Sequence, residues 1–325
     1  MNEPSSASGG ARARLPAVDI VRGAALVAMF GYHLTWDLAH FGYVEATTPF
    51  SPAMRLISHV IASTFLFVAG ASLVLARRNP FDWRAYWKRL ALVAGAAFAV
   101  PVASWFLFPD AIIWFGILHC IAAASLLALP FLFLPWPAAL AAAIAVAAAP
   151  HFLASAVFDR PLWDWTGLGL TLPRTNDFRP LLPWAAPLLA GVAVMGLALP
   201  LGASDFLARF KGASAPARLL AFGGRHSLIV YLVHQPLFFA ALSVAAWAFP
   251  AGGPADEKPF RASCERQCEG SGGPRDVCVS SCACTAARLK QLGLWNRSGE
   301  NRLDAAESRM VAQAASECVA NARRN

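Results

Sequence analysis

The stretch VDIVRGAALVAMFGYHLTWDLAHFG, residues 18–42, is apolar enough to form a membrane-spanning helix, yet it carries Asp19, Arg22, His33 and Asp37. Each ionisable side chain at membrane depth costs at least about 2.5 kcal/mol on insertion scales, so such side chains face protein or a water-filled cavity. Positions 19, 22, 26, 30, 33 and 37 recur every three or four residues and therefore share one helix face. The stretch predicts a spanning helix with a functional polar face.

The composition of the whole chain also indicates a membrane protein. Of its 325 residues, 57% are apolar and 14% are charged, whereas soluble domains contain about 25% charged residues. The formal net charge of +8 would suggest nucleic-acid binding in a soluble protein, but basic residues beside spanning helices are explained by membrane topology. We therefore expect membrane lipid, and no nucleic acid, around this protein.

Apolar runs of roughly 20 residues, the length that crosses a hydrocarbon core about 30 Å thick, recur along the chain. They lie near residues 17–38, 54–76, 88–108, 112–134, 137–157, 181–201 and 226–249. Proline punctuates the short turns PDA (109–111) and PWP (135–137), so the helices on either side are expected to be antiparallel neighbours. The prediction is an all-α, polytopic bundle of about seven spans.

The basic residues predict the orientation of these helices, because cytoplasmic loops are enriched in Lys and Arg. They cluster before the first span, between the second and third, and between the sixth and seventh. The amino terminus is then cytoplasmic, and the carboxyl terminus lies in the periplasm of a bacterial inner membrane. A cleaved signal peptide is disfavoured, because Arg22 interrupts the apolar run and no small-residue cleavage site follows.

Beyond residue 250 the sequence becomes polar and contains six of the seven cysteines. Four of them have the spacing Cys264-x3-Cys268-x9-Cys278-x3-Cys282, and cysteines four apart share one face of a helix. This spacing suits a helical hairpin in which Cys264 pairs with Cys282 and Cys268 pairs with Cys278, although spacing alone leaves other connectivities open.

The other two cysteines of this segment, Cys284 and Cys318, are expected to form a third disulfide. A zinc site is disfavoured because the segment contains no histidine, so no metal is expected, and disulfides agree with an external location. The chain is thus predicted to have a disordered tail at 1–14, a transmembrane domain at 15–250 and a disulfide-bonded, extracytoplasmic helical tail at 251–325.

Polar side chains also occur inside other predicted spans. His119 lies in the fourth span, and the seventh contains Ser227, Tyr231, His234 and Gln235. Ser227, Tyr231 and His234 share a helix face by steps of four and three. A lone histidine on a helix face is more often a packed, hydrogen-bonded residue than a catalyst, and both interpretations stay open for each histidine.

Five segments, in this order, carry a family resemblance. They are RLPAVDIVRGAALVAMFGYH (14–33), FLFVAGASLVLARR (65–78), FGILHCIAAASLL (115–127), LLPWAAPLLAG (181–191) and GRHSLIVYLVHQP (224–236). Together they resemble the heparan-alpha-glucosaminide N-acetyltransferase catalytic-domain family, which includes bacterial membrane proteins. The resemblance covers about residues 14–240. It implies a polytopic acyltransferase that takes acetyl from cytoplasmic acetyl-CoA and delivers it to a sugar or similar acceptor from the far side.

For such a reaction, His33 oriented by Asp37 is the candidate base, or the group that is acetylated first. In the lysosomal enzyme of the family the catalytic histidine lies further beyond the D..RG motif than His33 does here. His40 is therefore the alternative base. Tyr231, His119 and Ser227 are candidate donors to the oxyanion, and His234 and Gln235 are further candidates for substrate contact.

The phosphates of CoA require positive charge at the cytoplasmic end of the bundle. Arg22, paired with Asp19, and Arg225 are candidates, together with the basic segment ARRNPFDWRAYWKR (76–89). The bias of cytoplasmic loops towards basic residues also explains that segment without any ligand.

A small-molecule or proton-coupled transporter is the alternative function, because it would also line a path with His, Asp and Arg side chains. The sequence has no visible repeat and an odd number of predicted spans, which counts modestly against the inverted halves of many transporters. Stabilisation by CoA discriminates between the two functions, since only the enzyme should show it.

Overall fold

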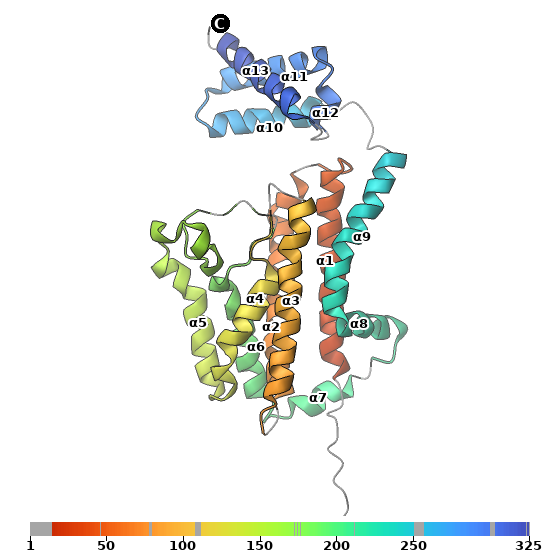
Figure 1. Ribbon diagram of the computed structural model, residues 1–325, viewed down its shortest axis with the longest axis vertical. Coiled ribbons are helices and arrows are strands. Elements are labelled where there is room, and N and C mark those ends of the chain that lie inside the picture. Colours follow the sequence, from red (N-terminus) through yellow and green to blue (C-terminus); the bar gives the residue numbers. More distant parts are fainter. Residues whose placement is uncertain are drawn as a thin grey trace, which may run out of the picture. The chain divides into compact units, whose positions relative to one another are not determined.

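The computed structural model describes residues 15–45, 47–77, 80–107, 112–171, 173, 175, 177–210, 212–249, 257–299, 303–322 and 324. Every regular element in these ranges is a helix, which confirms the predicted all-α class (Figure 1). The predicted tail at 1–14 lies outside the described residues. The chain forms two compact units, one comprising Met1–Tyr32 and Arg55–Gln235, the other His33–Met54 and Pro236–Asn325.

Six helices in the described ranges are long and apolar enough to cross a membrane, and the protein is a multi-pass membrane protein. They are α1 (Pro16–His40), α2 (Pro52–Ala76), α3 (Trp83–Leu107), α5 (Trp136–Leu153), α6 (Leu181–Ala198) and α9 (Ser227–Ala248).

The predicted span at 112–134 differs from the other six. It contains α4 (Ile117–Ala128), which at 1.5 Å per residue is only about 18 Å long. A 3-10 turn, Pro130–Leu132, follows it. Pro130 has no N–H to continue the helix and disfavours helical geometry in the residue before it. The bundle of about seven predicted spans therefore consists of six long helices and one short one.

Short helices lie in the connections between these elements. They are η1 (Thr48–Phe50), η4 (Ala156–Phe158), η5 (Pro161–Thr166), α7 (Ala203–Arg209) and α8 (Ala215–Arg225). In the connection after α5, the Asp159 carboxylate accepts N–H groups from Thr171 at 2.9 Å and Leu170 at 2.6 Å. These bonds, led by the one from the Thr171 backbone, lower the pKa of Asp159, and they close the connection into a compact loop.

Glycines bring the helix backbones of the first unit close together. A Cβ added to Gly70 of α2 would lie 1.9 Å from the Leu188 carbonyl oxygen of α6, and one added to Gly191 of α6 would lie 2.1 Å from the Phe67 carbonyl oxygen. Helices in lipid gain little hydrophobic stabilisation when they associate. Van der Waals packing stabilises the contact instead, and small residues allow the backbones to come close enough for it.

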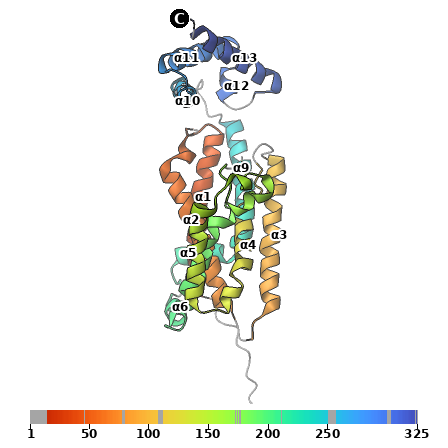
Figure 2. The same cartoon turned by 90° about the vertical axis from the view of Figure 1, so that its left-hand side faces the viewer.

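The largest buried cluster of the first unit lies between α2, α4 and α6, with α5 packed along α6 (Figures 1 and 2). Leu66, Cys120 and Leu188 are fully enclosed there. This packing fixes the positions of the polar side chains that α2, α3 and α4 carry.

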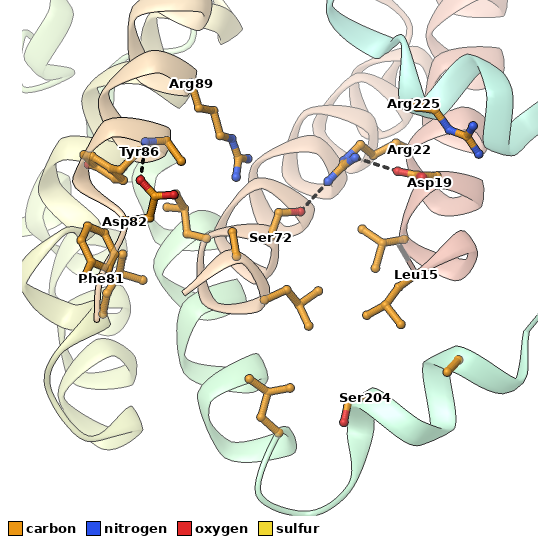
Figure 3. A pocket seen from close by; sticks show the side chains of 18 of the residues that line it. Leu15, Asp19, Arg22, Ser72, Phe81, Asp82, Tyr86, Arg89, Ser204 and Arg225 are labelled. Atoms are coloured by element: carbon orange, nitrogen blue, oxygen red, sulfur yellow. Dashed lines mark hydrogen bonds and ion pairs between the residues drawn. The ribbon is translucent and has the colours of Figure 1, made fainter. Parts of the chain in front are cut away.

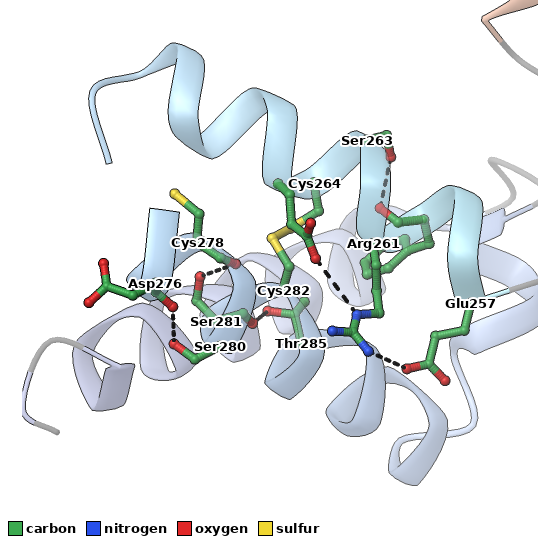
Figure 4. Close-up of polar contacts among 12 residues, drawn as sticks. Glu257, Arg261, Ser263, Cys264, Asp276, Cys278, Ser280, Ser281, Cys282 and Thr285 are labelled. Atoms are coloured by element: carbon green, nitrogen blue, oxygen red, sulfur yellow. Dashed lines mark hydrogen bonds and ion pairs between the residues drawn. A yellow bond between two sulfur atoms is a disulfide. The ribbon is translucent and has the colours of Figure 1, made fainter. Parts of the chain in front are cut away.

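The second unit contains four helices rich in polar residues and cysteine: α10 (Glu257–Gly270), α11 (Arg275–Gln291), α12 (Trp295–Gly299) and α13 (Ala305–Ala322). Cys264 pairs with Cys282 (Figure 4). Cys268 pairs with Cys278, so α10 and α11 form the predicted hairpin. The hairpin turns at Gly272, whose φ of +87° is readily adopted only by glycine.

The third predicted disulfide is also present, and it joins Cys284 of α11 to Cys318 of α13. A small core that includes Leu289 and Trp295 lies among these helices. Asp304 and Glu307 form a reciprocal cap at the start of α13. The Asp304 carboxylate accepts the Glu307 N–H at 2.8 Å, and the Glu307 carboxylate accepts the Asp304 N–H at 2.9 Å.

Candidate functional site

A cavity of about 730 Å³ lies at one end of the first unit (Figure 3). Its walls come from the start of α1, the end of α2, the start of α3, α7 and the end of α8. Three residues that the sequence singled out, Asp19, Arg22 and Arg225, line it. The structure adds Ser72 and, from the basic segment 76–89, Arg89.

Arg22 is held in place at the cavity wall by two side chains. Its Nη1 donates to Asp19 Oδ1 at 3.0 Å, and its Nη2 donates to Ser72 Oγ at 2.5 Å (Figure 3). Asp19 lies in the first turn of α1, where the helix dipole favours a negative charge. The predicted pair therefore exists, and a hydroxyl of α2 fixes the orientation of its guanidinium group.

The other two arginines of the cavity have no such partners. The side chains of Arg89 and Arg225 make no hydrogen bond or ion pair with any residue that the structure describes. Three carboxylates belong to the lining. Asp19 is bound to Arg22, Asp82 accepts the Ala85 N–H at 2.9 Å at the start of α3, and Asp205 of α7 makes no ion pair with Arg89 or Arg225 in the described part of the chain. The cavity can therefore offer two guanidinium groups to an anion, and guanidinium groups match phosphate geometry.

A second polar cluster lies beside the start of α4 and was not foreseen from the sequence. Asp177, in the segment before α6, accepts the Ile117 N–H at 3.3 Å. Its other carboxylate oxygen lies 3.8 Å from Nε of Arg179. The Arg179 guanidinium also donates to Ser58 of α2 and lies 4.6 Å from the ring centroid of Trp184. The only sequence signal for this cluster was a loop with charges of both signs.

Two predicted residues, His119 and Tyr231, lie within electrostatic range of the Asp177 carboxylate. Nδ1 of His119 is buried and has no hydrogen-bond partner in the described part of the chain. Tyr231 packs against the buried cluster that contains Leu26 and Met29 of α1 and also against the cluster that contains Ala97 of α3. Both side chains thus lie inside the bundle in the neighbourhood of Asp177.

The cavity and the Asp177 cluster contact opposite ends of α2. Ser72 belongs to the cavity and Ser58 to the cluster. The two serines are 14 residues apart, which corresponds to about 21 Å along the helix. The first unit thus has two polar sites that are separated along α2.

The remaining predicted residues are distributed over both units. Ser227 is the first residue of α9. His234 is 6% exposed, and its Nδ1 lies 2.6 Å from the Tyr231 carbonyl oxygen. Its ring stacks on Phe30 of α1, with ring centroids 5.3 Å apart. Gln235 ends the first unit. His234 is therefore a packed residue whose ring contacts the Tyr231 carbonyl oxygen and Phe30.

His33 and Asp37 belong to the second unit and lie one turn apart on α1. Asp37 is only 3% exposed, and His33 is half-buried. His40, the alternative base, is exposed, and its ring contacts Phe41 and Phe239. One helical turn separates Asp37 from His33, so the two residues lie on the same side of α1.

Comparison with known families relates this arrangement to a biochemical class. The family model described as heparan-alpha-glucosaminide N-acetyltransferase, catalytic, matches residues 14–236, which is more than half of the chain. The chain belongs to this family. No curated protein and no solved structure matches it. The matched region of this heparan-alpha-glucosaminide N-acetyltransferase family member contains the cavity, the Asp177 cluster, His33 and Asp37, and it ends before the disulfide-linked helices.

Proposed function

We propose that this protein is a membrane-embedded acyltransferase. It would take an acetyl or other acyl group from acetyl-CoA at the cytoplasmic surface and transfer it to a sugar or similar acceptor from the opposite side. Membership of a membrane acetyltransferase family supports the class of reaction. The observation that carries the proposal is the pair of unpartnered guanidinium groups, Arg89 and Arg225, in a cavity large enough for part of a nucleotide.

The basic residues at the cavity end of the bundle support an orientation of the protein in the membrane. They are Arg77 directly after α2, Arg84 and Lys88 in the first two turns of α3, Arg209 at the end of α7 and Arg218 in α8. Basic connections favour the cytoplasm, where acetyl-CoA is made available. The amino terminus would then be cytoplasmic, with the transmembrane domain at 15–250 in a bacterial inner membrane. The disulfide-linked tail at 251–325 would lie in the periplasm, which favours oxidised cysteines.

The residues of the chain divide the chemistry between them. Arg22, Arg89 and Arg225 bind the phosphates of CoA. His33, oriented by Asp37, removes the proton from the attacking hydroxyl or amine as that group bonds to the thioester carbonyl carbon. The C–S bond then breaks and the CoA thiolate takes up a proton. In a two-step version, the His33 imidazole bonds to the thioester carbonyl carbon and the C–S bond breaks. The acceptor then bonds to the same carbon, and the bond from that carbon to the imidazole nitrogen breaks. Tyr231, His119 and Ser227 are the candidate donors to the oxyanion, and His234 and Gln235 the candidate acceptor contacts.

Binding of CoA tests the cavity. We expect CoA to raise the melting temperature of the wild-type protein in detergent. Arg89→Gln should weaken CoA binding about tenfold or more, because a charge-assisted hydrogen bond contributes about 1.5 to 3 kcal/mol. Arg84→Gln is the matched control, since Arg84 is an exposed arginine of the same helix outside the cavity. If wild-type protein does not bind CoA, the acyltransferase proposal fails and a transporter is the better account.

Acyl transfer itself tests the base. In proteoliposomes with radiolabelled acetyl-CoA, His33→Ala should abolish transfer while leaving the melting temperature nearly unchanged, because the residue would be present for chemistry rather than packing. Asp37→Asn should reduce transfer less, since it misorients the base without removing it. Full activity in His33→Ala would exclude His33 and transfer the role to His40 or His119. Parallel loss of folding and activity would show that His33 is structural.

A further inference from the structure

A second hollow of the first unit, a groove of about 570 Å³, runs along α2 and is almost entirely apolar. The α2 residues that line it recur every three or four positions, so they form one face of the helix. They are His59, Val60, Ser63, Thr64, Phe67, Val68 and Ala71. Val21 of α1 and Val60 of α2, both about half-exposed, leave the groove open to the membrane. A lipid chain can therefore enter from the side.

The groove extends along about half of the length of α2. His59 and Ala71 are 12 residues apart, or about 18 Å along the helix, whereas half of the hydrocarbon core is about 15 Å thick. His59 lies seven residues from the start of α2 at Pro52, on the side away from the CoA cavity. The groove runs from there towards the cavity, where Val18 of α1 and Leu207 of α7 also line it. A single acyl chain that enters at the His59 end fits this length.

The end of the groove at His59 is surrounded by positive charge. Arg55 precedes His59 by four residues and so lies on the same face of α2. Arg55 and Arg179 both lie within electrostatic range of the His59 imidazole, whose ring also contacts Trp184 at 5.2 Å between centroids. Asp177 is the carboxylate near this group, and it lies beside Arg179. The side chain of Arg55 makes no hydrogen bond or ion pair with the described residues.

The geometry points to a binding site for a membrane phospholipid with an anionic phosphate headgroup. One acyl chain would lie in the groove, and the phosphate would bind Arg55 and His59, with Arg179 as further positive charge. Apolar contact alone would admit any lipid, whereas the cations at the groove's end favour an anionic one, each basic residue near the surface contributing about 1 kcal/mol. The site does not depend on acyl transfer, because the residues tested below lie outside the proposed catalytic and CoA-binding residues.

This site can be tested by native mass spectrometry of the full chain in a nonionic detergent. The measurement compares the binding of phosphatidylglycerol with that of phosphatidylcholine carrying the same acyl chains. We expect tighter binding of phosphatidylglycerol. Arg55→Gln should weaken it about fivefold, as about 1 kcal/mol predicts, whereas Arg55→Lys should largely retain it. Arg84→Gln, at the other end of the bundle, is the matched control and should leave it unchanged. Equal binding of the two lipids, or no effect of Arg55→Gln, would overturn the proposal.

A second variant separates the chain from the headgroup. Val60→Trp should fill the groove from its exposed side and weaken phosphatidylglycerol binding with little change in the melting temperature of the lipid-free protein, since Val60 is 56% exposed. Inorganic phosphate alone should neither raise the melting temperature nor displace the lipid. Stabilisation by inorganic phosphate through Arg55, or unchanged lipid binding in Val60→Trp, would show a soluble-anion site and refute the lipid site.

Discussion

The membrane helices and the tail helices are held together in different ways. Helices α2 and α6 touch at glycines, which have no side chain to keep the backbones apart. Helices α10, α11 and α13 are joined by disulfides. The difference follows from the surroundings that the two segments were predicted to have. In lipid, an apolar surface gains little by turning inward, so close backbone contact is needed. In water, a segment of about 70 residues buries only enough apolar surface for marginal stability. Disulfides stabilise such a segment because they restrict the conformations of its unfolded state. The first two predictions below each break one of these devices, and the last two remove hydrogen bonds within a single segment.

The largest effect is expected where two membrane helices touch. Gly70→Leu should prevent α2 and α6 from packing, because even a Cβ would lie 1.9 Å from the Leu188 carbonyl oxygen. We expect a loss of more than about 4 kcal/mol, seen as disappearance of the monodisperse peak in size-exclusion chromatography of the detergent-solubilised protein. Gly95→Leu is the control, since an added Cβ there meets no atom within 4 Å. Equal behaviour of the two variants would contradict the proposed role of close packing.

The next largest effect is expected from removal of disulfides. The loss of stability should depend on the length of the loop that each disulfide closes. Replacing Cys284 and Cys318 by serine opens a link across 34 residues, whereas replacing Cys268 and Cys278 opens one across 10. The chain-entropy relation predicts losses of about 3.8 and about 2.7 kcal/mol. Limited proteolysis of the tail in the intact protein should therefore be faster in the first variant. The reverse order would show that contacts within the folded tail, rather than loop entropy, dominate.

A smaller effect is expected at the start of α13. Asp304→Ala removes the acceptor for the Ala306 and Glu307 N–H groups, and loss of such a cap costs about 1 kcal/mol. Asp304→Asn should retain most of this stability, because asparagine caps helices nearly as well. The measurement is the thermal unfolding of the tail, monitored by its susceptibility to proteolysis. No difference between alanine and asparagine would mean that the cap contributes nothing.

The smallest effect concerns the loop after α5 and depends on pH. Hydrogen bonds lower the pKa of Asp159 in the folded protein, so its contribution is fully present above the unfolded value of about 3.9 and is lost as pH falls through the folded value. Hydrogen exchange at Leu170 and Thr171, corrected for intrinsic rates, should increase only on acidification below that range. Asp159→Asn should remove this pH dependence, and a dependence that persists in the variant would assign it to another group.

Part of the candidate site followed from helix periodicity alone. Asp19 and Arg22 are three residues apart, and their pairing needs nothing beyond the geometry of one helix. The cysteine pairs followed similarly, because a spacing of four aligns two sulfurs on one helix with two on its neighbour. His33 and Asp37 lie one turn apart for the same reason, and their catalytic role stays a prediction.

Other parts could not be read from the sequence. Ser72 lies 50 residues from Arg22, and Ser58 lies 121 residues from Arg179, and nothing in an apolar run marks which serine will face a guanidinium. The segment 76–89 contained many basic residues, but only the packing of α3 shows that Arg89 lines the cavity while Arg84 does not. The short length of α4 was missed because the flanking apolar residues hid the boundaries at Gly116 and Pro130.

The sequence by itself determined the membrane environment, the helices, the two local charge and cysteine patterns and the family, because each depends on composition or on neighbours within one or two helical turns. The tertiary structure decided which polar groups converge. Two helices can pack in many registers that all bury similar apolar surface, and close contacts such as Gly70 against Leu188 select one of them. That selection places Arg89 in the cavity, Asp177 at the start of α4 and His59 at the end of a groove.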